Sequence, residues 1–176
     1  GAILVAKILV GGLMKAGYDV KMSEVHGMSQ RGGSVSTQVH WGKKVYSPVI
    51  GQAAADIVVS FEKMEAVRYA DYLKKDGVAV INDFEMPSST IAAGLVEYPA
   101  GCMEAMEKHF RVLKLDAGKI AEDLGNAKCM NVVLFGSMVK ALGMTDIDWE
   151  AVIAETVPAK FKELNLAAYR AGFDAV

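Results

Sequence analysis

The chain has 176 residues, of which 52% are hydrophobic and 23% are charged, so we expect one globular domain with a sizeable core. Its 19 Lys and Arg residues nearly balance its 21 Asp and Glu residues, and neither sign forms a long run. This balance argues against nucleic-acid binding, which needs a basic face. No apolar stretch is long enough to span a membrane, and the apolar N-terminus is interrupted by Lys7 and Lys15. The sequence therefore predicts a cytoplasmic protein that binds neither nucleic acid nor membrane.

The first part of the chain predicts a buried helix followed by strands. Residues 2–17 are apolar on nearly every side of a helix and end at an Ala-Gly pair, a typical helix end. Residues 19–25 alternate between apolar and polar and are expected to form a strand. A second strand is expected at 34–41. After a turn at 42–44, residues 45–47 are expected to return beside it as a hairpin.

The middle of the chain predicts a strand, a helix and a parallel strand. The apolar runs at 57–61 and 77–82 suit buried parallel strands, and helical spacing connects them over 62–73. Glu62 follows the first strand, and Asn82 and Asp83 follow the second. Open α/β sheets bind ligands at these carboxyl ends, which makes the three residues secondary site candidates. For Glu62, a favourable charge in the first turn of a helix is an equally good explanation.

The remaining elements complete an α/β pattern. The connection at 86–99 has no regular period. It is followed by a helix at 101–109, a strand at 110–115, and helices at 117–124, 132–142, 149–155 and from Pro158 to 171–172. We expect a three-layer α/β/α domain with a largely parallel Rossmann-like sheet and one antiparallel element. The apolar C-terminal helices are expected to cover one face of the sheet or to form a dimer surface.

The strongest functional signal is a loop rich in glycine and polar residues between the strands at 19–25 and 34–41. The proposed interface or ligand residues of this loop are His26, Gly27, Met28, Gln30, Arg31, Gly32 and Gly33. The planar fork of Arg31 suits a carboxylate or a phosphate, and the glycine pair allows a ligand or another backbone to come close. Arg31 could instead pair with Glu24 of its own chain. His26 could move a proton, or it could simply bond to loop carbonyls.

Cofactor sites of the chain's own are not indicated. Cys102 and Cys129 are the only cysteines, whereas an iron–sulfur cluster usually takes four thiolates. We expect two buried thiols. No histidines have metal-ligand spacing, and no nucleophile motif surrounds the serines near His26. We therefore predict no metal site and no catalytic residue.

Several segments resemble a known family. They are SEVHGMSQRGGSV from Ser23, VYSPVI from Val45, DIVVSFEKMEAVRY from Asp56 and GVAVIND from Gly77. Together they are similar to the gamma-type domain of 2-oxoacid:ferredoxin oxidoreductases, nearest to the indolepyruvate branch. The resemblance covers residues 1–176 as a single domain. Members usually begin with a strand and a GxGGQG turn, whereas this sequence has only Gly1 in place of the last glycine. A sheet without that strand would leave its neighbours without a partner.

The resemblance implies a role within a larger enzyme. In such enzymes a large subunit binds thiamine pyrophosphate with Mg and [4Fe-4S] clusters, decarboxylates the 2-oxoacid, passes the acyl group to coenzyme A and sends electrons to ferredoxin. The gamma-type chain binds no cofactor alone and completes the assembly. The sequence thus predicts a non-catalytic or co-catalytic subunit, most simply of an enzyme acting on indolepyruvate or another arylpyruvate. The alternatives are a stand-alone Rossmann-like nucleotide-binding module and a scaffold that joins or dimerises larger subunits.

Overall fold

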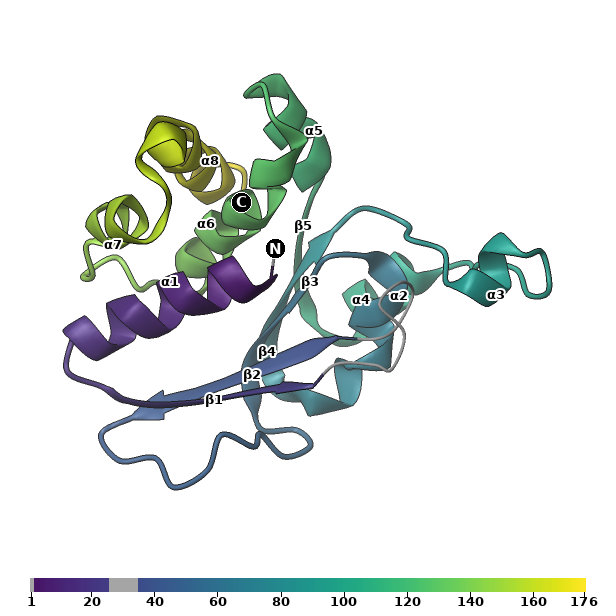
Figure 1. Ribbon diagram of the computed structural model, residues 1–176. Helices are drawn as coiled ribbons and strands as arrows, with labels where there is room; N and C mark the ends of the chain where they lie inside the picture. Colours follow the sequence, from purple (N-terminus) through teal and green to yellow (C-terminus); the bar gives the residue numbers. More distant parts are fainter. Residues whose placement is uncertain (1, 26–34) are drawn as a thin grey trace.

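The computed structural model describes residues 2–25 and 35–176, which form a mixed α/β fold that ends in a run of helices (Figure 1). The strands are β1 (Asp19–Val25), β2 (Ser36–Gly42), β3 (Ala55–Ser60), β4 (Leu73–Asn82) and β5 (Arg111–Leu115). The helices are α1 (Ala2–Lys15), α2 (Lys63–Arg68), α3 (Ser89–Ala92), α4 (Cys102–His109), α5 (Ala117–Asp123), α6 (Met130–Leu142), α7 (Trp149–Thr156) and α8 (Lys162–Asp174). Short 3-10 helices lie at Ala70–Tyr72, Ala127–Cys129 and Ala159–Phe161.

The centre of the fold is a parallel sheet in the order β3-β4-β5. Successive side chains of a strand point to opposite faces, and each face of this sheet has its own core. Val59 and Val80 contribute to the larger core, whereas Val58, Ala79 and Ile81 contribute to the smaller one. Helices therefore have to cover both faces, as parallel sheets require.

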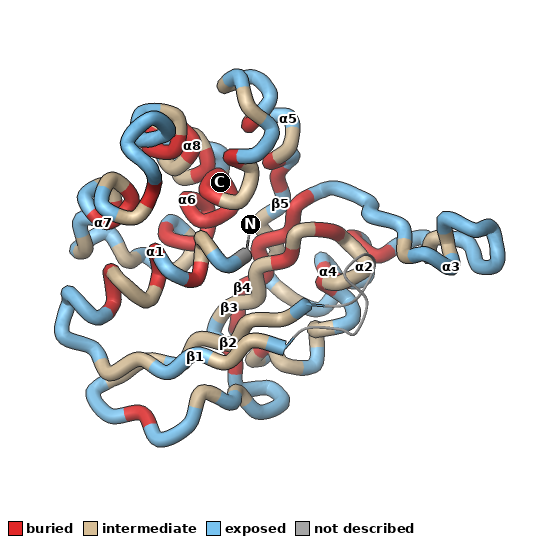
Figure 2. Tube along the Cα trace, viewed as in Figure 1, coloured by how far each residue is buried: buried red, intermediate tan, exposed pale blue. Residues whose placement is uncertain are grey.

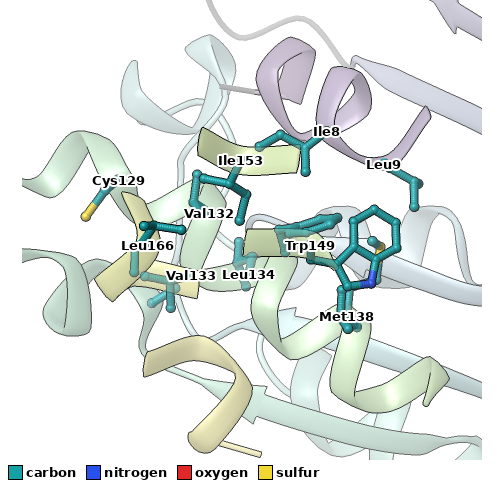
Figure 3. Close-up of a cluster of buried hydrophobic side chains, with 14 of the residues drawn as sticks. Ile8, Leu9, Cys129, Val132, Val133, Leu134, Met138, Trp149, Ile153 and Leu166 are labelled. Atoms are coloured by element: carbon teal, nitrogen blue, oxygen red, sulfur yellow. The ribbon is translucent and has the colours of Figure 1, made fainter. Parts of the chain in front are cut away.

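Helices form a layer on each side of the sheet. On one side α1, α6, α7 and α8 build the larger core, in which Ile8, Phe135, Trp149 and Ile153 are almost completely buried (Figure 3). On the other side α2 and α4 supply Ala66, Met103 and Met106 to the smaller core. The predicted three-layer α/β class with a largely parallel sheet is confirmed. Among the described residues, no helix combines the length and the apolar character needed to cross a membrane.

The antiparallel element is the pair β1–β2, whose strands precede and follow residues 26–34 in the sequence. Its register runs from Asp19 opposite Gly42 to Val25 opposite Ser36. The predicted hairpin strand at 45–47 was wrong, because β1 is the strand that pairs with β2 in the described structure. Val45 is instead buried, and its backbone N–H donates to Asp19 Oδ2 at 2.9 Å.

The helix predicted at 62–73 is shorter than expected. α2 ends at Arg68, a 3-10 turn follows, and β4 begins at Leu73 rather than at residue 77. Leu73 is buried in the smaller core and lies opposite Ala55, with an irregularity in register between Ala55 and Ile57. Burial of Leu73 against the sheet thus ends the helical segment early.

The connection after β4 projects from the body of the molecule. We call residues 84–100 the arm; it includes α3, whose first turn is capped by the Ser88 hydroxyl. No residue of the arm is buried, and Figure 2 shows it as an extension of exposed and half-buried chain. Sequence periodicity predicted an irregular connection here but not its projection.

Candidate functional site

The carboxyl edge of the parallel sheet brings together the predicted strand-end residues. Glu62 lies two residues after β3, Asn82 is the last residue of β4, and Asp83 follows it. Asp116 follows β5 at the same edge and caps α5 by accepting a hydrogen bond from Lys119 N at 3.0 Å. Because the parallel strands β3, β4 and β5 all end at the same edge of the sheet, the topology brings these polar side chains close together.

Asn82 is completely buried and connects three segments. Its Nδ2 donates to the carbonyl of Phe61 at 3.1 Å, and its Oδ1 accepts from the backbone N–H of Ala117 at 2.9 Å. The amide thereby joins the end of β4 to the end of β3 and to the start of α5. Asp83, by contrast, is exposed: its backbone N–H donates to the Leu115 carbonyl at 2.8 Å, and its carboxylate makes a long ion pair with Lys63 at 3.8 Å.

Replacing Asn82 by alanine is expected to lower the free energy of unfolding by about 2–3 kcal/mol, because two buried backbone groups lose their partners. Chemical denaturation measures this loss. Asp83→Ala is the matched control at the neighbouring exposed position, and its effect should stay within about 0.5 kcal/mol. Equal losses in the two variants would contradict the structural role of the Asn82 amide.

Glu62 is also buried, and its carboxylate collects donors from separate segments. Its Oε2 accepts from Tyr98 Oη at 2.6 Å and from Met86 N at 3.4 Å, while its Oε1 accepts from Glu65 N and caps α2. Tyr98 Oη in turn accepts from Met64 N at 2.9 Å. Burial and the adjacent Glu62 carboxylate raise the pKa of Tyr98 above its ordinary value, so the phenol remains a donor.

A polar cavity of about 300 Å³ opens beside this network, between the arm and the first turn of α4. Lys63 Nζ lies 2.9 Å from Glu85 Oε1 and 3.8 Å from Asp83 Oδ1 in its wall. The hydrogen bond with Glu85 raises the pKa of Lys63. Lys114, the second cation of the wall, pairs with Glu107 at 3.2 Å. Because both ammonium groups already face carboxylates, the cavity suits a neutral polar group better than a phosphate.

Both cysteines are buried, as expected. Cys102 borders the polar cavity, and its Sγ is 3.5 Å from the carbonyl of Pro99. Cys129 Sγ is 3.0 Å from the carbonyl of Asn126. Burial raises the pKa of both thiols, which keeps them protonated and unreactive.

The loop that carries the primary candidates lies outside the described residues. This applies to His26, Gly27, Met28, Gln30, Arg31, Gly32 and Gly33, whose roles stay predictions. The strand ends on either side of the loop are described: Val25 and Val35 are both exposed. Glu24, the alternative partner considered for Arg31, accepts a hydrogen bond from Thr37 Oγ1 at 3.4 Å.

A second hollow, of about 580 Å³, lies between the start of α7 and the end of α8. Its wall combines aromatic and acidic side chains: Trp149, Tyr169, Phe173, Asp148, Glu150 and Asp174. Burial raises the pKa of Tyr169 to about 12, with a smaller contribution from Glu150. Sequence reasoning missed this hollow because its residues come from two helices that only packing brings together. Across residues 2–25 and 35–176, no three His, Cys, Asp or Glu side chains are grouped closely enough to hold a metal ion.

Comparison with known proteins gives consistent matches over the whole chain. Residues 1–175 match the family model described as pyruvate ferredoxin/flavodoxin oxidoreductase. The chain is 36% identical over 181 residues to indolepyruvate oxidoreductase subunit IorB of Thermococcus kodakarensis, covering 99% of this chain and 90% of that protein.

Solved structures show the same fold. Pyruvate oxidoreductase subunit PORC of Thermotoga maritima matches with a TM-score of 0.69 at 18% identity, over 97% of this chain and 86% of that one. A 2-oxoglutarate:ferredoxin oxidoreductase of Magnetococcus marinus, with 2-oxoglutarate, coenzyme A and succinyl-CoA bound, matches with a TM-score of 0.65 at 16% identity. That match covers 98% of this chain but 27% of the other, so the fold there forms one part of a longer polypeptide. The chain therefore belongs to the pyruvate ferredoxin/flavodoxin oxidoreductase family.

Proposed function

We propose that this chain is a subunit of an indolepyruvate:ferredoxin oxidoreductase. The observation that carries the proposal is the 36% identity to an indolepyruvate oxidoreductase subunit, which extends over 99% of this chain. A second archaeal relative with the same description, from Pyrococcus horikoshii, is 37% identical over 99% of the chain. The substrate would then be indolepyruvate or a related arylpyruvate, and the products an acyl-CoA and reduced ferredoxin.

The residues of this chain do not fit the redox cofactors of such an enzyme. It has two cysteines, and each thiol is buried against the backbone carbonyl of the residue three positions before it, whereas a [4Fe-4S] cluster takes four thiolates. Thiamine pyrophosphate and the clusters, which supply decarboxylation and electron transfer, therefore belong to a larger partner subunit in this proposal.

The contribution of this chain would come from the loop at 26–33. Arg31 would present its guanidinium to a carboxylate or phosphate at the contact with the large subunit, near the reacting centre or the coenzyme A approach. The glycines beside Arg31 would allow close approach of the partner's backbone or of a ligand. Asp83, which is exposed at the carboxyl edge of the parallel sheet, would be a second contact position.

Purification of the tagged, complete chain from an anaerobic lysate of its source tests the proposal. A brown complex should elute, containing a large subunit and thiamine pyrophosphate, and it should reduce ferredoxin with indolepyruvate faster than with pyruvate or 2-oxoglutarate. A colourless lone chain that binds a free nucleotide would support the Rossmann-like nucleotide-binding module instead. A complex that strongly prefers another 2-oxoacid would contradict the indolepyruvate assignment alone.

Replacing Arg31 by alanine is expected to lower the rate of ferredoxin reduction by the assembled enzyme by at least about tenfold, because the variant loses one charge-assisted contact. Arg68→Ala is the matched control, because Arg68 is half-exposed on α2 and pairs with Glu65 of its own helix at 3.4 Å. Its turnover should equal that of the wild type. Assembly is followed by size-exclusion chromatography: loss of turnover in an intact complex supports a role near the active site, whereas failure to assemble supports a scaffold. Unchanged turnover of Arg31→Ala would contradict the proposed role.

A further inference from the structure

The arm at residues 84–100 presents large apolar side chains to solvent. Leu95 is 76% exposed and Val96 is 59% exposed, and Phe84 and Met86 near its base are also exposed. Exposed apolar groups that occur together on a projecting segment are typical of interaction surfaces, whereas isolated ones are common on any protein. Within the part of the chain that the structure describes, no residue of the arm is buried, so its apolar side chains remain largely open to solvent.

The base of the arm is nevertheless held firmly. Buried Glu62 accepts hydrogen bonds from both sides of the arm, from Met86 N on the outgoing side and from Tyr98 Oη on the returning side. The backbone N–H of Lys63 donates to the carbonyl of Phe84 at 3.0 Å. These contacts fix both roots of the arm to the first turn of α2. Because both roots are fixed, the direction of the arm is set without a partner. A segment fixed in this way before binding loses less conformational freedom when it docks.

The charge of the arm restricts what can cover it. Glu85 and Glu97 are its only charged residues, and it has no Lys, Arg or His. Glu85 is paired with Lys63 at the base of the arm, so Glu97, which is exposed and follows Val96, is the charge that faces a partner. A partner surface must therefore combine apolar side chains with basic groups at the rim. The larger hollow between α7 and α8 fits the acidic arm of another copy poorly: it is lined by Asp146, Asp148, Glu150 and Asp174, and its one lining cation, Arg170, already pairs with Glu150.

We propose that the arm docks into an apolar, basic-rimmed groove on another subunit of the oxidoreductase, with Leu95 and Val96 as the buried contacts. This inference rests on the proposed function. The match to one part of a longer 2-oxoglutarate:ferredoxin oxidoreductase chain supports such a partner, because there the same fold is built next to further protein. Glu62 acts in this proposal as a positioning residue for the arm.

The test measures binding of the purified large subunit to the complete chain by anaerobic calorimetry. The double variant Leu95→Ser/Val96→Ser should bind at least about tenfold more weakly than the wild type, since buried apolar anchors carry much of an interface's affinity. Because both side chains are exposed in the free chain, the melting temperature of the double variant should equal that of the wild type. Met14→Ser is the matched control: Met14 is equally exposed, but it lies on α1, on the far side of the molecule from the arm (Figure 1), and its variant should bind normally.

A charge reversal tests the basic rim independently. Glu97→Lys should weaken binding, and the loss should shrink as salt is raised, because exposed charge pairs are screened. Glu163→Lys, at the exposed start of α8, should leave the affinity unchanged.

The outcomes separate the two proposals. A wild-type chain without affinity for the large subunit would contradict the proposed function and the docking with it. Wild-type binding that both arm variants retain in full would overturn the docking alone. Sedimentation of the free chain tests the remaining alternative, in which the arm docks on a second copy. If the wild type is a dimer and Leu95→Ser/Val96→Ser is a monomer, the second copy is the occupant and the proposal is overturned.

Discussion

Replacing Gly172 by alanine is expected to lower the free energy of unfolding by about 3 kcal/mol or more, because α6 and α8 touch backbone to backbone at this residue. A β-carbon on Gly172 would collide with the carbonyl of Val133, and one on Gly136 would collide with the carbonyl of Tyr169. The same crossing includes a hydrogen bond from Ser137 Oγ to the carbonyl of Gly172 at 2.7 Å. Rigid backbone cannot move aside as a flexible side chain can, so the helices would have to separate.

Urea denaturation of the purified chain measures this effect. Gly118→Ala is the matched control within another helix, since a β-carbon there meets its nearest neighbour, Asp116 Oδ1, at an ordinary 3.6 Å. That variant should be as stable as the wild type or more stable by up to about 1 kcal/mol, as expected for glycine replaced by alanine in a helix. If Gly172→Ala were equally harmless, the close crossing of α6 and α8 would be disproved.

Truncation of Trp149 to alanine is expected to cost about 3–5 kcal/mol. The indole is almost completely buried, and its ring meets Phe135 edge to face with centroids 5.2 Å apart. Its Nε1 donates to the carbonyl of Met144 at 2.7 Å, so the substitution also leaves that carbonyl without its partner. On the opposite side the ring fills the space left by Gly12 in α1. Trp149 therefore joins α1, α6 and α7.

Thermal and chemical unfolding followed by far-UV circular dichroism report this loss. Phe161→Ala provides the comparison, because Phe161 is an aromatic residue of the same region whose side chain is exposed. Its loss should be below about 1 kcal/mol. Comparable losses in the two variants would show that the Trp149 contacts do not hold the three helices together.

Local sequence signals predicted most of the elements. The apolar runs of β3 and β4 and the helices that follow β5 depend on neighbouring residues alone, and the structure confirms them. Pairing was less predictable. Residues 45–47 follow β2 after a turn signal, yet β2 pairs with β1, which precedes a segment that carries no short-hairpin signature. Strand partners depend on tertiary contacts that local sequence patterns do not contain.

The candidate site was predicted in position but not in its connections. The predicted strand ends placed Glu62 and Asn82 at one edge of the sheet, where the structure has them, and their role in ligand binding stays a prediction. It could not reveal that Tyr98, 36 residues away, donates to Glu62, because hydrogen bonds between distant segments leave no periodic signal. The projection of the arm could not be predicted either, because exposed apolar residues such as Leu95 resemble core residues in a sequence.

The separation of the two sheets has a consequence for local stability. Within the described ranges, the β1–β2 ladder shares no backbone pairing with β3, β4 and β5. Side-chain packing holds the pair to the rest of the molecule, because Val20, Val39 and Trp41 pack against the larger core and α1 lies against both strands. The position of the two strands that border residues 26–34 therefore depends on apolar contacts with that core and not on backbone pairing with the described central strands.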